Sequence, residues 1–163
     1  MKVAIVMGSE SDYPVVQKAE RILESFEVEI ITRILSAHRA AKAVADFADK
    51  AEGEGIEVII AAAGKAAHLA GVIASRTPVP VIGIPIKSST LDGLDSLLSV
   101  AQMPKGVPVA TVAIDGAENA ALLAVQILSL KYPALRADMK KYKEKMENDV
   151  IAVDEEFRRK RND

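Results

Sequence analysis

The sequence predicts an α/β fold in which a parallel sheet of five strands carries helices on both faces. Two observations lead to this prediction. Short apolar runs, as in buried strands, alternate with longer segments whose apolar residues recur with helical spacing. Strands that alternate with helices along a chain form parallel sheets. A chain of 163 residues, without internal repeats or a linker, is long enough for one domain with a full core.

Five apolar segments are expected to be the strands, and each ends at a polar, proline or glycine-containing break. The first segment, Val3 to Met7, is apolar throughout, as in a strand that is buried on both faces. It ends at Gly8, so we expect a strand rather than a signal peptide. The predicted strands are 3–7, 28–35, 56–63, 79–86 and 108–114.

The segments between these strands are expected to be helices. After the first strand, Val16, Ala19 and Leu23 have the spacing of one helical face. Further predicted helices cover about 40–53, the segment from 66 to about 76, 93–101 and 117–130, and a last helix starts near 133. We therefore expect a single domain over residues 1–163, with an α/β core over 1–132 and a C-terminal helix with a charged tail over 133–163.

Composition narrows the class of protein. Hydrophobic residues make up 50% of the chain and aromatic residues only 4%, which predicts a core of Ala, Val, Ile and Leu. The net charge of −2, with no basic block before the C-terminus, argues against a nucleic-acid partner. The absence of Cys fits a reducing, cytoplasmic compartment, and no apolar run is long enough to predict a membrane span. Two histidines and no cysteine make a poor zinc set, although carboxylate-bound magnesium stays open.

The first loop at the carboxyl edge of the predicted sheet has features of an anion-binding site. Ligands of open parallel sheets bind at this edge. Ser9 and Ser11 offer hydroxyl groups, and the following helix offers free N–H groups. Asp12 would repel a phosphate but could accept hydrogen bonds from sugar hydroxyls. The alternative is that Ser11 or Asp12 only caps the helix.

Each of the next two loops contains one of the two histidines of the chain. His38 can exchange a proton near pH 7, and the adjacent Arg39 can bind phosphate or carboxylate through two parallel hydrogen bonds. The alternative is a solvated pair on a surface loop. His68 lies early in the third helix, among small residues, and the alternative there is a packing histidine that hydrogen-bonds a neighbouring loop.

These motifs resemble, in order, those of the class I 5-(carboxyamino)imidazole ribonucleotide mutases, also known as catalytic subunits of phosphoribosylaminoimidazole carboxylase. The similarity runs from Val3 to about Tyr132. The matching motifs are Gly8-Ser9-Glu10-Ser11-Asp12, Ser36-Ala37-His38-Arg39, Ala66-Ala67-His68-Leu69, Asp92-Gly93-Leu94-Asp95-Ser96-Leu97, Gln102-Met103-Pro104 and Asn119-Ala120-Ala121-Leu122-Leu123-Ala124. The resemblance implies a three-layer αβα flavodoxin-like fold with a five-stranded parallel sheet and an extra C-terminal helix. It also implies an octamer with active sites at subunit contacts, and no metal or cofactor.

The resemblance assigns a role to each matched residue. His38 would be the catalytic acid and base, and Asp12 would hold the ribose hydroxyls. The phosphate site would be lined by Ser9, Ser11, Ser36 and Arg39. The pocket for the base and the carboxylate would be lined by Gly64, Ala66, Ala67, His68 and Leu69.

The sequence departs from the pattern of this family at several positions, among them the glycine-rich run before the second histidine, which is here Ala61-Ala62-Ala63-Gly64-Lys65. Ala40 and Ala41 stand where the family usually has Thr-Pro, and Ala70 stands in place of a proline. Lys65 puts a long cation where the family usually has a small or apolar residue. We expect its charge to lie at the mouth of the pocket, where it would attract the anionic groups of the substrate and disfavour protonated His38. The alternative is that it points outward.

The implied reaction moves a carboxylate from the exocyclic nitrogen of an aminoimidazole ribonucleotide to ring carbon C4 in purine biosynthesis. A direct carboxylase that uses dissolved CO₂ on the unmodified nucleotide is the nearest alternative. An FMN-binding electron carrier of the same fold is another, but aromatic side chains to stack on a flavin are few. A phospho-acceptor receiver would need clustered acidic residues at several strand ends, and only the first loop combines two of them.

Overall fold

The middle layer of the protein is a five-stranded sheet, seen in a computed structural model that describes residues 1–162. All strand pairings are parallel, and the order is β2-β1-β3-β4-β5. The strands are β1 Lys2–Met7, β2 Glu29–Ile34, β3 Val58–Gly64, β4 Val81–Ile86 and β5 Ala110–Thr111. The predicted α/β class with a five-stranded parallel sheet is confirmed.

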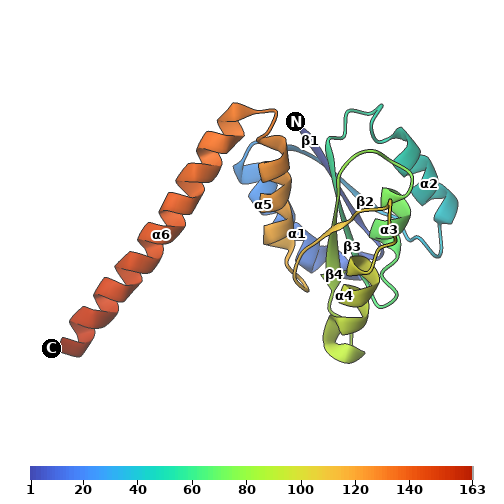
Figure 1. Ribbon diagram of the computed structural model, residues 1–163. Helices are drawn as coiled ribbons and strands as arrows, with labels where there is room; N and C mark the ends of the chain where they lie inside the picture. The colour runs from blue at the N-terminus through green and yellow to red at the C-terminus, as the bar shows by residue number, and fades with distance from the viewer. Residues whose placement is uncertain (163) are drawn as a thin grey trace.

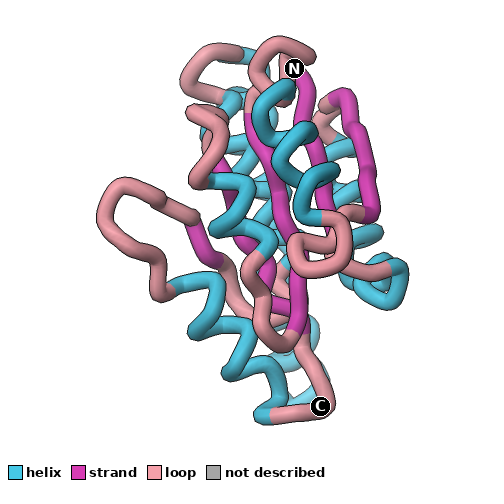
Figure 2. The backbone as a smooth tube through the Cα atoms, turned by 90° about the vertical axis from the view of Figure 1, so that its right-hand side faces the viewer, coloured by secondary structure: helices cyan, strands magenta, loops and turns pink. Residues whose placement is uncertain are grey.

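Helices cover both faces of the sheet (Figure 1 and Figure 2). One face carries α1 Tyr13–Ser25 and α5 Ala117–Leu128, and the other carries α2 Ala41–Lys50, α3 Leu69–Ala74 and α4 Leu94–Ala101. Two short 3-10 turns, η1 Glu10–Asp12 and η2 Leu91–Gly93, precede α1 and α4. This arrangement leaves the carboxyl ends of the strands free of helices.

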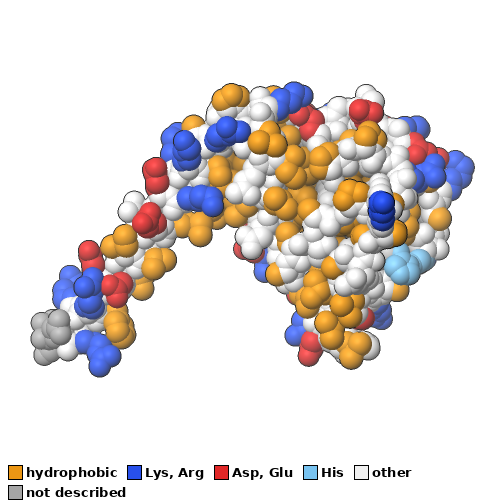
Figure 3. Space-filling model, viewed as in Figure 1, with side chains coloured by type: hydrophobic (Ala, Val, Ile, Leu, Met, Phe, Trp, Pro, Cys, Tyr) orange, Lys and Arg blue, Asp and Glu red, His pale blue; other side chains and the backbone are white. Residues whose placement is uncertain are grey.

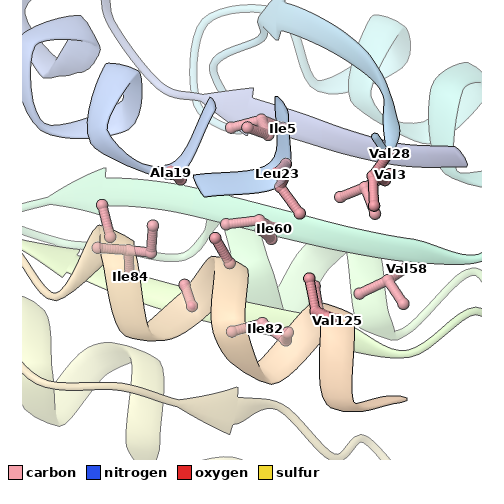
Figure 4. Packing of buried hydrophobic residues seen from close by; sticks show 14 of the residues in the cluster. Val3, Ile5, Ala19, Leu23, Val28, Val58, Ile60, Ile82, Ile84 and Val125 are labelled. Atoms are coloured by element: carbon pink, nitrogen blue, oxygen red, sulfur yellow. The ribbon is translucent and has the colours of Figure 1, made fainter. Parts of the chain in front are cut away.

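Two apolar clusters hold the layers together, because successive side chains of a strand point to opposite faces. In β1, Val3 and Ile5 pack towards α1 and α5, as Figure 4 shows, whereas Ala4 and Val6 pack towards α2 and α3. These side chains are fully buried on both faces. The continuous apolar runs of the sequence are therefore the strands in the middle of the sheet.

The fifth strand is shorter than predicted. The sequence predicts a strand over 108–114, but only Ala110 and Thr111 pair with β4. Pro85 of β4 faces this edge, since its carbonyl accepts a hydrogen bond from the backbone N–H of Asp115 at 2.9 Å. Proline has no N–H to donate, so the ladder lacks one of its hydrogen bonds beyond Thr111.

The last helix, α6 Pro133–Asn162, extends away from the sheet (Figure 1). Its start packs on the domain, where Met139 is 7% exposed and the rings of Tyr142 and Phe26 are 6.0 Å apart. Further along, Val150 is 69% exposed. Figure 3 shows apolar side chains along this helix and on the adjoining body. Among residues 1–162, no helix combines the length and the apolar character needed to cross a membrane.

Candidate active site

A cavity of about 650 Å³ lies at the carboxyl edge of the sheet, between the loops that follow β1, β2, β3 and β4. The chain brings these loops together because the strands are parallel and adjacent. Of the residues predicted for the site, the cavity is lined by Ser9, Ser11, Asp12, Ser36, His38, Arg39, Gly64, Ala66, His68 and Leu69. The remaining one, Ala67, does not line it.

Glycine at the end of β3 allows the close approach of backbones on which the cavity floor depends. A Cβ atom at Gly64 would lie 3.3 Å from the carbonyl oxygen of Ile86 in β4. That spacing is tighter than ordinary van der Waals contact, so a side chain here would push β3 and β4 apart at the cavity. At the end of β1, Gly8 continues the pairing with β3 by one residue, since its N–H donates to the Ala62 carbonyl at 3.0 Å.

Hydroxyl and guanidinium groups from the first two loops form one polar cluster. The Ser11 hydroxyl donates to Ser9 Oγ at 2.9 Å. Arg39 connects the two loops, because its Nε donates to Ser36 Oγ at 3.2 Å and its Nη2 donates to the Gly8 carbonyl at 3.0 Å. A guanidinium has five N–H donors, so donors remain for a ligand. The cluster can therefore bind an anion such as phosphate.

Asp12 is the buried carboxylate of the cavity, with 8% of its surface exposed. Burial raises the pKa of Asp12, while hydrogen bonds from the Ser9 backbone and the Ser11 hydroxyl and the charge of Arg39 oppose this rise. The side chain makes no capping hydrogen bond to α1. Its carboxylate thus has acceptor capacity left for a ligand, and the capping function belongs to Ser9, whose Oγ accepts from the Ser11 N–H in η1.

The two histidines of the chain meet in the cavity although 30 positions separate them. His38 Nε2 lies 2.9 Å from His68 Nδ1, and the two rings are nearly perpendicular, at 79°. A hydrogen bond between two imidazole nitrogens requires one to donate and the other to accept, so the pair holds a proton between the rings. Both side chains are exposed, and the histidine surface is visible from outside in Figure 3. The pair can therefore exchange protons with a ligand in the cavity.

Comparison with known proteins agrees with this geometry. Residues 2–149 match the family model described as AIR carboxylase. The chain belongs to the AIR carboxylase family. The resemblance inferred from the sequence motifs is thus confirmed.

Named relatives of this AIR carboxylase family member are similar over most of their length. N5-carboxyaminoimidazole ribonucleotide mutase of Pyrococcus abyssi is 59% identical over 145 residues, which cover 89% of this chain and 83% of the relative. The protein of the same name from Thermotoga maritima is 55% identical over 150 residues, which cover 92% and 88%. The crystal structure of Treponema denticola PurE has a TM-score of 0.85 at 32% identity and covers 95% of this chain and 97% of that one.

The prediction that Ala67 lines the pocket is wrong. Ala67 is 1% exposed, and its side chain packs in the cluster between the sheet, α2 and α3. Its N–H donates to the Lys65 carbonyl at 2.8 Å in a tight turn. This turn directs Ala66 to the cavity and Ala67 to the core, which the sequence pattern of small residues does not distinguish.

The loop after β4 also lines the cavity, although none of its residues was among those predicted for the site. The backbone N–H of Lys87 donates to Asp115 Oδ1 at 2.9 Å, and its ammonium lies 3.3 Å from Asp92 Oδ1. The Ser88 hydroxyl donates to the Thr90 carbonyl at 2.9 Å. A run of hydroxyl residues directly after a buried strand was the sequence signal for this wall. The further lining residues are Gly8, Ala37, Ala63, Lys65, Ile86, Lys87, Ser88 and Ser89.

Clusters suited to a metal ion are absent from residues 1–162, in which no three His, Cys, Asp or Glu side chains converge. The charged and polar side chains of the cavity instead comprise hydroxyls, a guanidinium, two ammonium groups, a buried carboxylate and paired imidazoles. Such a set can bind an anion, accept hydrogen bonds from sugar hydroxyls and move a proton.

Proposed function

We propose that the chain catalyses the mutase reaction of purine biosynthesis, in which the carboxylate of N5-carboxyaminoimidazole ribonucleotide moves from the exocyclic nitrogen to C4. The product is 4-carboxy-5-aminoimidazole ribonucleotide. The observation that carries this proposal is the His38–His68 pair, held at 2.9 Å beside an anion-binding cluster in one cavity. The names of the relatives favour the same reaction over a direct carboxylase or a flavin carrier.

The substrate is expected to lie along the carboxyl edge of the sheet. Its phosphate would bind the hydroxyls of Ser9, Ser11 and Ser36 and the guanidinium of Arg39, because these groups already converge. Asp12 would accept hydrogen bonds from the ribose hydroxyls. The imidazole base would then reach the wall formed by Gly64, Ala66, His68 and Leu69, opposite His38.

His38 would act first as an acid and then as a base. Protonated His38 gives its proton to the exocyclic nitrogen as the N–C bond breaks, which releases CO₂ and leaves a neutral imidazole. C4 then attacks CO₂, and neutral His38 removes the C4 proton, which restores the aromatic ring and the protonated histidine. Protons and carboxylate balance over the cycle. His68 would hold His38 in position through their shared hydrogen bond.

Carbon dioxide must stay in the site between these steps, and exclusion of water serves this purpose. In the isolated chain His38 and Arg39 are exposed, so the cavity needs a cover. Neighbouring copies in an octamer, with active sites at their contacts, would supply it. Exposed apolar side chains support such contacts: Leu94 and Leu98 on α4 are about half exposed, as is Phe157 on α6.

Assembly is tested by light scattering on the wild type and on Val150→Glu, which puts a charge among the exposed apolar side chains of α6. We expect a multimer for the wild type and a smaller species for the variant, because an unpaired buried charge is costly. Asn148→Glu, which adds the same charge on another face of the same helix, is the matched control. A monomer mass for the wild type would overturn the octamer. We also expect the enzyme to be cytoplasmic, which cell fractionation tests.

Supplying each nucleotide separately tests the reaction itself. The wild-type protein is incubated with the N-carboxylated ribonucleotide, or with the aminoimidazole ribonucleotide and bicarbonate, and product absorbance is followed. We expect rapid product formation from the first substrate and much slower formation from the second. Faster conversion of the second substrate would replace the mutase by the direct carboxylase.

A further inference from the structure

Lys65 combines an unfavourable backbone conformation with a place in the cavity wall. Its φ is 55°, in the left-handed region, which costs a residue with a side chain roughly 1 kcal/mol relative to ordinary backbone. Among the residues described, five that are not glycine have positive φ, and Lys65 is the one that lines the cavity. An outlier at a ligand-binding wall is a reason to ask what its side chain does there.

The charge of Lys65 is the least engaged of the three cations around the cavity. Arg39 donates to Ser36 and to the Gly8 carbonyl, and Lys87 pairs with Asp92 at 3.3 Å. Within residues 1–162, the Lys65 side chain takes part in no ion pair and no hydrogen bond. Its ammonium is therefore available to an anionic ligand.

The position of Lys65 separates it from the phosphate cluster. Ser9, Ser11 and Arg39 belong to the loops after β1 and β2. Lys65 follows β3 and lies three positions before His68, whose ring contacts His38. The second anionic group of the proposed substrate, its carboxylate, reacts at this histidine pair. The cation of the third loop is thus on the side of the cavity where the carboxylate is expected.

We infer that Lys65 is a specificity-determining residue, whose ammonium binds the carboxylate of the substrate and product and favours carboxylated over uncarboxylated ribonucleotide. This inference rests on the proposed function. The neutral CO₂ between the two steps gains nothing from this charge. Lys65 therefore acts on the affinity for both carboxylated nucleotides and not on the phosphate that all of these nucleotides share.

Calorimetric binding of two ribonucleotides to the full-length protein tests this role. The probes are the 4-carboxylated product and the uncarboxylated aminoimidazole ribonucleotide. In Lys65→Gln we expect the affinity for the carboxylated nucleotide to fall about two- to fivefold, the range for exposed ion pairs, with the other affinity unchanged. The difference should shrink in high salt, which screens exposed charges, and Lys65→Arg should retain the preference. Lys105→Gln, an exposed lysine outside the cavity wall, is the matched control.

Lys65→Gly is a second variant that is expected to fold like the wild type, because glycine tolerates a positive φ. We expect it to lose the preference with a Tm no lower than that of the wild type. An equal loss of affinity for both nucleotides would place the Lys65 charge at the phosphate. Unchanged affinities for both would place the side chain outside the site. Either result would overturn the inference while the wild type still binds and converts its substrate. A wild type that binds neither nucleotide would overturn the proposed function and the inference with it.

Discussion

Replacing His38 by Asn should remove most of the turnover and leave the fold intact. The His38 side chain is exposed, and its hydrogen bond within residues 1–162 is the one to His68 at 2.9 Å. Loss of such a surface contact changes the free energy of unfolding by no more than about 0.5 kcal/mol, which is ~1–2 °C in Tm for a chain of this size. Removal of a general acid and base costs about 10²- to 10⁴-fold in turnover, or roughly 3–5 kcal/mol in the barrier.

The assay follows conversion of the N-carboxylated ribonucleotide by absorbance, with calorimetric binding of the product and thermal unfolding as controls. The His38→Asn variant should bind the product and unfold near the wild-type temperature. In His68→Asn we expect a smaller loss of turnover, because His68 acts through the position of His38. Turnover near that of the wild type in His38→Asn would remove this residue from the mechanism, and a larger loss in His68→Asn would reverse the two roles.

Three further substitutions test other parts of the structure. Arg39→Lys should raise KM about tenfold, because lysine lacks the planar fork that binds phosphate and contacts the Gly8 carbonyl; an unchanged KM would show that Arg39 does not bind phosphate. Asp12→Asn should weaken nucleotide binding but raise Tm at pH 7. Burial raises the pKa of Asp12 in the folded state, so the ionised form costs stability, and this cost appears as the pH rises through the folded pKa. The gain in Tm should vanish in acid, where both states are protonated, and an equal gain at every pH would contradict this account. Gly83→Ala should destabilise the protein by about 1–3 kcal/mol, because the added Cβ would overlap Val100 Cγ1 and lie 3.0 Å from Val109 Cγ1; a Tm within 1 °C of the wild type would show that these side chains move aside.

Local sequence patterns predicted most of the secondary structure. The run from Val3 to Met7 lies within β1, and Val16, Ala19 and Leu23 form the buried face of α1. Such patterns are reliable where each face of a helix or strand keeps the same surroundings, core or solvent, along its whole length. The prediction for 108–114 overestimated β5, because the length of an edge strand depends on the donors of its neighbour and not on its own residues.

The site loops were predictable from the sequence for a topological reason. In a parallel sheet every strand ends at the same edge, so residues after strands gather there whatever their distance along the chain. The loop after β4, with Ser88 and Ser89, follows the same rule. Its omission from the predicted site shows the limit of motifs, since the topological rule marks this loop as a wall of the site but the matched motifs assign no role to its hydroxyl groups.

The sequence by itself determined the α/β class, the family and the loops that carry the chemistry, because these depend on the order and polarity of residues along the chain. Tertiary structure alone decided which atoms meet. It placed His38 Nε2 against His68 Nδ1, buried the carboxylate of Asp12, and turned Ala67 into the core while Ala66 faces the cavity. Contacts between separate loops depend on sub-ångström backbone positions set by the packing of the whole sheet, and no local pattern encodes them.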